Sequence, residues 1–278
     1  MENVSWIYAR SQDWALKNIS ITIREGDFIA IMGENGAGKT TFCRLLNGLI
    51  PHSLPGKLLG TVSVDGIDTA NSTVAQLAGK AGMTFEDPET QLFTASVADE
   101  IAFALENLLL PPQEIREKVR WALDKTGLSA YADNAPPTLS GGQKQRLAIA
   151  AALAMAAKIL VLDEPCSQLD PSGAREVLSL ISDLRSNRGL TVVMATGSGE
   201  EAADFADKIC VLKNGRLAAF DTPCRIFANQ DLLLDSGIQA PQVSQFACRM
   251  TGLGKPLPQF PVNLDEAESS VLNWYRNG

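Results

Sequence analysis

The chain has 278 residues, of which 45% are hydrophobic, and it carries a net charge of −8 with a pI of about 4.8. This composition is typical of a globular protein with a substantial core. The length suits one large domain with an appendage, or two small domains. Nucleic-acid binders usually present a basic face, so the acidic balance predicts no nucleic-acid partner.

Membrane insertion and metal binding by cysteine are both disfavoured. The most apolar run, 147–157, ends at Lys158, well short of the roughly 20 residues that a spanning helix needs. The N-terminus lacks a basic region followed by an apolar one, so we expect no secretion signal. The five cysteines are scattered and form no CxxC pair, which favours reduced thiols. If a membrane is involved, we expect a partner to supply it.

The first third of the chain predicts strands around a glycine-rich loop. Alternating residues at 19–23 and an apolar run at 28–32 predict two strands, separated by a turn at 25–27. A helix is expected from about 39 to 49. Residues 61–68 predict a hairpin strand.

The middle of the chain predicts helices followed by two buried strands. Helical periodicity covers 96–127, interrupted by two prolines, and a further helix is expected from about Ser140. The apolar runs 159–162 and 191–194 predict buried strands.

The last part predicts a hairpin and then a less regular tail. Residues 210–217 contain an Asn-Gly pair, which is typical of a tight hairpin turn. From about residue 231 the periodicity weakens and prolines become frequent. We therefore expect 231–278 to be a small C-terminal appendage of helices and loops.

The glycine-rich loop at 33–40 matches the GxxxxGK[ST] pattern, and it stands between a predicted strand and a predicted helix. Such a loop turns its backbone N–H groups toward phosphates, and the helix N-terminus adds partial positive charge. We expect the amine of Lys39 to reach the β- and γ-phosphates and the hydroxyl of Thr40 to ligate Mg²⁺. The alternative is a chance glycine-rich turn. The predicted nucleotide contacts of this loop are Gly33, Glu34, Asn35, Gly36, Ala37, Gly38, Lys39, Thr40 and Thr41.

Two carboxylates follow the apolar run at 159–162. Asp163 suits the outer shell of Mg²⁺, and Glu164 suits a residue that orients or deprotonates an attacking water. The alternative is a strand-end turn with two solvated acids, which is disfavoured downstream of a P-loop. Glu164 is therefore the predicted catalytic residue.

Residues 139–143 (LSGGQ) open a predicted helix in which Ser140 can act as the N-cap. The two glycines expose N–H groups that could hold a phosphate. The predicted nucleotide contacts of this string are Ser140, Gly141, Gly142 and Gln143. Together with the P-loop and the Asp-Glu pair, in this order, the string resembles the ABC transporter ATPases over about residues 4–230.

The resemblance implies an α/β fold of the P-loop NTPase type. It comprises a RecA-like parallel sheet, an antiparallel β lobe, and a helical subdomain over about 86–155, all within an ABC nucleotide-binding domain at 1–230. It also implies ATP and Mg²⁺ as cofactors. In this family two subunits pack head to tail, and each ATP lies between the P-loop of one and the Ser-Gly-Gly of the other. Residues 167–170 match the loop that touches the opposite subunit. Tyr8 matches an aromatic that stacks on adenine, with plain core packing as its alternative.

A narrower resemblance joins the segments 85–93 and 96–107 to the ATPases of energy-coupling factor importers, which take up vitamins or transition metals in prokaryotes. Residues 240–247 and 264–267 also fit that group. The resemblance implies a second ATPase subunit, an integral transmembrane scaffold subunit, a small substrate-binding membrane subunit, and a place on the cytoplasmic face of the cell membrane. In that group the tail, here 231–278, adds contacts between the ATPase subunits.

The same resemblance implies where the membrane partner docks. Phe93 and the segment 86–107 are expected to form the groove for the partner's coupling helices. Asp99 and Glu100 are candidates to pair with arginines of that partner. The alternative for both carboxylates is an ordinary solvated helix face.

Two positions depart from the family pattern. Glu86 stands where the family places a glutamine that reaches Mg²⁺; a carboxylate can still bind the ion. Gly197 stands where the family places a histidine that contacts the γ-phosphate, and the only histidine in the chain is His52. Losing one preorganised donor typically costs roughly 10²–10³ in rate. We therefore expect ATP binding with slow hydrolysis, as in the weaker half of a heterodimer.

Three other functions remain open at this point. The chain could serve another class of ABC importer, or act as a soluble ABC ATPase outside transport. DNA-repair types insert a long coiled coil between P-loop and signature, which this sequence lacks, and translation types carry two cassettes. A regulatory subunit that does not hydrolyse ATP is the third alternative, and Glu164 argues against it.

Overall fold

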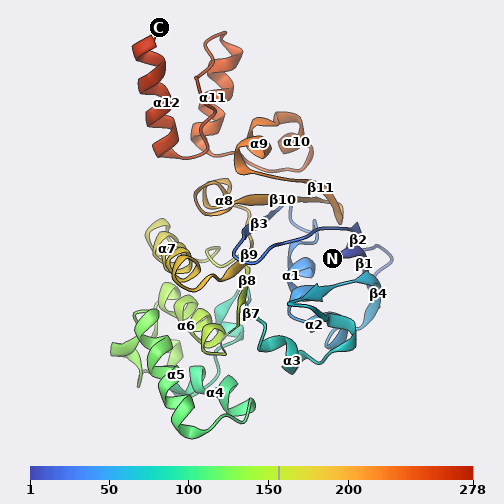
Figure 1. Ribbon diagram of the computed structural model, residues 1–278, viewed down its shortest axis with the longest axis vertical. Coiled ribbons are helices and arrows are strands. Elements are labelled where there is room, and N and C mark those ends of the chain that lie inside the picture. Colours follow the sequence, from blue (N-terminus) through green and yellow to red (C-terminus); the bar gives the residue numbers. More distant parts are fainter. Residues whose placement is uncertain (156, 278) are drawn as a thin grey trace.

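The computed structural model describes residues 1–155 and 157–277, and a six-stranded sheet lies at its centre (Figure 1). Five strands run parallel, and only the edge strand β11 is antiparallel to its neighbour. In spatial order the strands are β11 (Arg216–Asp221), β10 (Lys208–Lys213), β3 (Phe28–Met32), β9 (Thr191–Ala195), β8 (Ile159–Asp163) and β7 (Ala81–Thr84).

The parallel register brings four functional loops to one edge of the sheet. Asp163 at the end of β8 pairs with Ala195 at the end of β9, and Ala195 pairs with Ile31 of β3. Because parallel strands share their carboxyl edge, the segments that follow β3, β9, β8 and β7 lie in that spatial order. The P-loop, the Gly197 loop, the Asp-Glu pair and Glu86 are those segments.

The two faces of the sheet bury alternate residues of the same strands. On one face Ile29, Ile31 and Val193 pack with helix α1 (Lys39–Leu46) and the β lobe. On the other face Leu160 and Val192 pack with the helices of the chain's middle. Burial on both faces explains why these strands appear in the sequence as continuous apolar runs. The helices on the second face include α6 (Gly141–Ala154), α7 (Pro171–Arg188), α8 (Gly199–Phe205) and α9 (Pro223–Ala228).

The β lobe is an antiparallel sheet in the order β2-β1-β4, with a small hairpin beside it. The expected strand at 19–23 is wrong, because the strand occupies Leu16–Ile19 and residues 20–23 lie outside any strand. Ile19 and Ile21 are nevertheless both buried, which produces the alternation in the sequence. The strands of the lobe and its hairpin are β1 (Glu2–Tyr8), β2 (Leu16–Ile19), β4 (Gly56–Thr61), β5 (Ser63–Val64) and β6 (Ile67–Asp68).

The helix expected at 39–49 is shorter than predicted. It ends at Leu46, and Gly48 with φ 79° precedes a separate short helix. A left-handed glycine commonly closes a helix because it has no Cβ to oppose the turn. The remaining short connections are α2 (Leu49–His52), η1 (Thr69–Asn71) and α3 (Val74–Ala78).

The helical subdomain lies at the bottom of Figure 1 and consists of α4, α5 and α6. Ser96 caps the first helix by accepting from the Asp99 N–H, and Pro112 opens the second. The break expected at the two prolines is therefore a helix boundary. The elements here are η2 (Pro88–Thr90), α4 (Val97–Asn107), α5 (Pro112–Lys125), η3 (Ser129–Tyr131) and η4 (Pro136–Thr138).

The C-terminal part contains α10 (Gln230–Asp235), α11 (Gln242–Gly252) and α12 (Leu264–Asn277). The last two helices stand at the top of Figure 1, beyond the sheet. Leu233, Ala240 and Val262 belong to the same buried cluster as Ala30 and Met32 of β3. The tail is thus anchored on the strand that leads into the P-loop. Within the described residues, none of the helices combines the length and apolarity required to cross a bilayer.

Phe42 should be a main support of the P-loop helix, since its side chain is 0% exposed between α1 and the sheet. Phe42→Ala should lower the free energy of unfolding by about 3–5 kcal/mol, because it removes buried surface and leaves a cavity. Phe246→Ala, at a position that is 44% exposed, should cost less than about 1 kcal/mol. Urea unfolding checks both, and equal losses would contradict this packing.

Candidate nucleotide site

The P-loop backbone takes conformations that only glycine adopts easily. Gly33, Gly36 and Gly38 have φ values of 146°, 83° and 108°. A Cβ at Gly33 would lie 2.2 Å from the Leu212 carbonyl oxygen, and one at Gly38 would lie 2.7 Å from that of Ala15. The loop is therefore threaded tightly past β10 and the segment before β2. Such a turn leaves successive backbone N–H groups free to surround an anion.

Lys39 spans this loop from the first turn of α1. Its Nζ donates to the Gly33 carbonyl at 2.9 Å and lies 3.4 Å from Oε1 of Glu164. Lys39 as a whole is only 8% exposed. The ammonium of Lys39 is thus fixed between the loop backbone and the predicted catalytic carboxylate. A β- or γ-phosphate bound in the loop would pair with this ammonium.

Thr40 and Asp163 meet across the gap between α1 and β8. The Thr40 hydroxyl donates to Oδ1 of Asp163 at 3.1 Å, and Asp163 is 2% exposed. Burial raises the pKa of Asp163, the Thr40 hydrogen bond opposes that shift, and the charges of Glu164 and Glu86 add to it. Glu86 therefore lies within electrostatic reach of Asp163, although its own side chain is exposed.

These oxygens fit Mg²⁺ shared with a nucleotide. The described part of the chain holds no group of three or more His, Cys, Asp or Glu side chains that could bind a metal by itself. Mg²⁺ usually takes one or two carboxylates and completes its shell with phosphates and water. A hydroxyl beside a buried carboxylate, next to a phosphate cradle, is that kind of donor set.

Glu164 connects three loops of the site. The backbone of Glu164 has φ 50°, and its N–H donates to the Ala195 carbonyl at 3.0 Å. Its Oε2 accepts from the backbone N–H of Gly197 at 3.1 Å, while Oε1 faces Lys39. The carboxylate is thus held on one side by the P-loop lysine and on the other by the loop after β9.

Tyr8 lies beside α1 rather than in free solvent. Its hydroxyl shares a 2.9 Å hydrogen bond with Oγ1 of Thr41, and its ring packs edge-on against Trp6 at 5.6 Å between centroids. The ring is half-buried at the end of β1. Both Tyr8 and Thr41 are therefore next to the P-loop, and stacking of Tyr8 on adenine stays a prediction.

The LSGGQ string begins α6, as expected. Ser140 and Gln143 form a reciprocal capping box: the Ser140 N–H donates to Gln143 Oε1 at 2.9 Å, and the Gln143 N–H donates to the Ser140 hydroxyl at 3.4 Å. Ser140 and Gly141 are exposed. The string makes no hydrogen bond or ion pair with residues 33–41 within the described ranges. The structure thus does not join the string to the chain's own P-loop.

Several expected surface residues have internal partners instead. Glu100 is 6% exposed, and its Oε2 accepts from the N–H groups of Phe93 and Thr94 and from the Thr94 hydroxyl. It is therefore wrong as a candidate for pairing with a partner's arginine. Asp99 is exposed but bonds the Ser96 hydroxyl at 2.7 Å. In the 167–170 loop, Asp170 caps α7 by accepting from the Gly173 N–H at 2.7 Å.

Two contacts of the site were not predicted from the sequence. Glu34 packs against Gly237 of the tail, where a Cβ would lie 2.3 Å from the Glu34 Cγ. Thr196 and Glu201 bond each other at 2.6 Å beside Gly197. The spacing of Ser198 and Glu201 suits a helix N-terminus and indicates the Ser198 cap, but it gives no sign that the Glu201 carboxylate bonds Thr196. The first contact joins distant segments and leaves no such signal.

Comparison with protein families matches residues 16–167, more than half of the chain, to the ABC transporter family. The chain belongs to the ABC transporter family. An energy-coupling factor transporter ATP-binding protein, EcfA1, of Symbiobacterium thermophilum is 40% identical and covers 99% of this chain and 96% of its own.

Two solved ABC structures are also similar. One is cbiO1 of Clostridium perfringens, described as part of the ABC transporter complex cbiONQ, with a TM-score of 0.72, 34% identity, and coverage of 91% of this chain and 96% of that chain. The other is a dimeric ATP-binding cassette in a post-hydrolysis state with ADP and Pi, with a TM-score of 0.68, 28% identity, and coverage of 80% and 97%.

These relatives confirm the α/β P-loop fold and the ABC-type ATPase class of the chain. They also confirm its resemblance to the energy-coupling factor ATPases. The family is thus an ATP-binding one, and the P-loop at 33–41 lies within the matched range.

Lys39→Ala should weaken ATP binding roughly 10- to 150-fold, because hydrogen bonds to charged groups contribute about 1.5–3 kcal/mol each. Lys158→Ala is the matched control, since that lysine is exposed and precedes β8 at the opposite edge of the sheet. Titration calorimetry with a non-hydrolysable ATP analogue measures both. Equal affinity for the ATP analogue in the Lys39 variant and the wild type would contradict the assignment of this loop as the nucleotide-binding P-loop.

Proposed function

We propose that this chain binds Mg²⁺-ATP and is the hydrolytically weaker half of a pair of different ATPase subunits. The pair energises a prokaryotic importer of the energy-coupling factor type, which takes up a vitamin or a transition metal. The observation that carries the weak-site part is Gly197. A backbone N–H at that position meets the Glu164 carboxylate, and there is no side chain to reach a γ-phosphate.

The residues of the site have separate roles in this proposal. The P-loop N–H groups and Lys39 bind the phosphates, and Tyr8 supports the adenine. Thr40, Asp163 and Glu86 would hold Mg²⁺, which when bound would supply positive charge beside the phosphates. Glu164 accepts the proton of the attacking water at a carboxylate oxygen.

The proposed asymmetry between the two ATPase subunits follows from which motifs of this chain are intact. The exposed Ser140 and Gly141 would complete the nucleotide site of the other subunit, and they are unaltered in this chain. Its own site lacks one charged or polar donor and carries an added carboxylate at Glu86. A homodimer would contain two impaired sites, whereas a partner with histidine and glutamine would contain one intact site. The pairing of two different chains is therefore the better arrangement.

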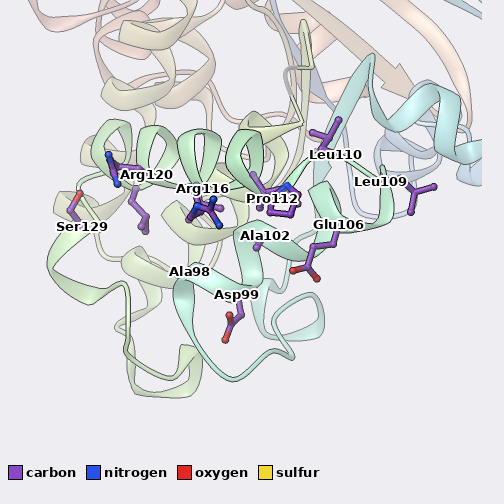
Figure 2. A pocket seen from close by; sticks show the side chains of 13 residues that line it. Ala98, Asp99, Ala102, Glu106, Leu109, Leu110, Pro112, Arg116, Arg120 and Ser129 are labelled. Carbon is purple, nitrogen blue, oxygen red and sulfur yellow. The ribbon is translucent and has the colours of Figure 1, made fainter.

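The membrane partner is proposed to dock on the helical subdomain. A groove of about 830 Å³ lies between α4 and α5 (Figure 2), with apolar residues such as Ala102 and Leu110 along it. Carboxylates of Asp99 and Glu106 come from α4, and guanidinium groups of Arg116 and Arg120 come from α5. Nearby, Phe93 is 66% exposed and packs edge-on against Phe103. Helices of an integral scaffold subunit would find apolar and charged contacts here, at the cytoplasmic face of the membrane.

The tail is proposed to add contacts with the second ATPase subunit. Leu264 and Tyr275 of α12 are 75% and 79% exposed, and Leu253 after α11 is 73% exposed. Apolar side chains that remain in solvent on α12 and just after α11 favour coverage by a partner. A small substrate-binding membrane subunit completes the proposed assembly, and it would select the cargo.

Restoring the missing donor should accelerate hydrolysis at this site. Gly197→His should raise the rate by at most roughly 10²–10³, the range typical of one preorganised donor. The backbone allows the change, because a Cβ at Gly197 meets no atom within 4 Å and its φ is not in the left-handed region. The measurement is ATP hydrolysis by the purified importer complex.

Gly79→His is the matched control for that experiment. Gly79 has an ordinary φ of −71°, and a Cβ there would lie no closer than 3.9 Å to its nearest neighbour, the Gln76 carbonyl oxygen, but it lies at the end of α3. It should leave the rate unchanged. A Gly197→His complex that hydrolyses ATP no faster than the wild type would contradict the weak-site proposal.

A further inference from the structure

The loop after β9 is held rigidly although it carries no histidine. Thr196 is 2% exposed, and its N–H donates to the Ile31 carbonyl at 3.1 Å, which ties the loop to the P-loop strand. Its hydroxyl donates to Oε2 of Glu201 at 2.6 Å and accepts from the Ser198 N–H at 3.0 Å. One residue is thus fixed through both its main chain and its side chain.

Glu201 is fixed in turn from the first turn of α8. Its N–H donates to the Ser198 hydroxyl at 3.2 Å, so Ser198 caps the helix. Its carboxylate is partly buried and makes no ion pair with any lysine or arginine in the described ranges. The hydroxyl of Thr196 is therefore the contact that orients this carboxylate.

Gly197 lies between Thr196 and Ser198, which both belong to this hydrogen-bond network. With Thr196 and Ser198 both restrained, the direction of the peptide N–H between them is set. That N–H lies 3.1 Å from Oε2 of Glu164. Behind the loop, Gly199 packs so tightly against the tail that a Cβ there would lie 2.3 Å from the Gln239 carbonyl oxygen. The loop is consequently braced from both sides.

We propose that Glu201 and Thr196 are positioning residues for ATP hydrolysis. Their hydrogen bond holds the Gly197 N–H against the Glu164 carboxylate, so a backbone amide orients the catalytic group at the position where the family places a histidine. The inference rests on the proposed function, in which Glu164 is the catalytic carboxylate. It explains how a site without histidine keeps an oriented base.

A purely structural role for the pair makes a different prediction. If Glu201 only stabilised α8, its loss would lower the stability of the fold and leave the Gly197 N–H in place. If it only placed negative charge near the nucleotide, its ionisation would matter and its hydrogen bond would not. Variants of Thr196 and Glu201 separate these cases because Thr196→Val removes the hydroxyl and keeps the shape.

The first readout is amide exchange at Gly197 in the full-length chain, followed by NMR. Thr196→Val and Glu201→Leu should each speed exchange roughly 10-fold, as expected for loss of a hydrogen bond to a charged group. Glu201→Gln keeps an acceptor oxygen for the Thr196 hydroxyl and should exchange like the wild type. Glu200→Leu, at the exposed neighbouring position, is the control and should also exchange like the wild type.

The second readout is hydrolysis in the importer complex whose second ATPase subunit has its catalytic carboxylate replaced by an amide, so that turnover comes from this chain. Thr196→Val and Glu201→Leu should lower kcat roughly 10-fold, leave KM for ATP within twofold, and show no additive loss when combined. Glu201→Gln should restore kcat.

The outcomes distinguish the two proposals. Unchanged Gly197 exchange and unchanged kcat in Thr196→Val would overturn the positioning role. So would a Glu201→Gln variant as impaired as Glu201→Leu, since charge would then be the requirement. If the complex shows no hydrolysis from this chain even with Thr196 and Glu201 intact, slow hydrolysis at this P-loop is wrong, while amide exchange still tests the positioning role.

Discussion

The position of the Glu164 carboxylate is the constraint on which the rest of the site depends. Lys39 holds one of its oxygens at 3.4 Å and the Gly197 N–H holds the other at 3.1 Å. These contacts come from the segments after β3 and β9, which reach the loop after β8 because the three strands are neighbours in the order β3-β9-β8 and run parallel and in register. The sheet therefore determines where the carboxylate that we propose as the base lies.

Negative charge gathered at the site determines what it needs from a nucleotide and a cation. Asp163 is buried, and its pKa is raised by that burial and by the nearby charges of Glu164 and Glu86. Carboxylates this close are costly unless a cation balances them. Lys39 supplies one positive charge, and Mg²⁺ would supply two more. Replacement of glutamine by Glu86 increases this need, whereas replacement of histidine by Gly197 removes a donor.

The sequence predicted the parts of the site that are encoded locally. The P-loop glycines, the capping serine of LSGGQ and the Asn-Gly hairpin each impose a backbone shape on a few neighbouring residues. Their order along the chain carries the resemblance to the ABC transporter ATPases, and that resemblance implied the fold class. Positions 86 and 197 stood out because the surrounding pattern fixes where the glutamine and histidine belong.

Contacts between distant segments could not be predicted in the same way. The Gly197 N–H reaches Glu164 through the pairing of β8 with β9, and Glu34 meets Gly237 through the folding of the tail onto the P-loop strand. Glu100 appeared to be a helix-surface charge, but loop N–H groups of Phe93 and Thr94 surround it. The alternation at 19–23 reflected burial beyond the end of β2, since Ile21 is buried and exchanges two backbone hydrogen bonds with Met1 although it lies outside the strand.

The most direct test compares Glu164 with the equivalent carboxylate of the second ATPase subunit that we propose. Glu164→Gln in this chain and the equivalent change in the second ATPase subunit are introduced separately, and substrate uptake into proteoliposomes is measured. Glu164→Gln keeps the shape of the side chain and removes its basicity. If this chain is the weaker half, uptake persists with Glu164→Gln and is lost when the second subunit is changed. Loss of uptake with Glu164→Gln and its persistence in the other variant would contradict the account.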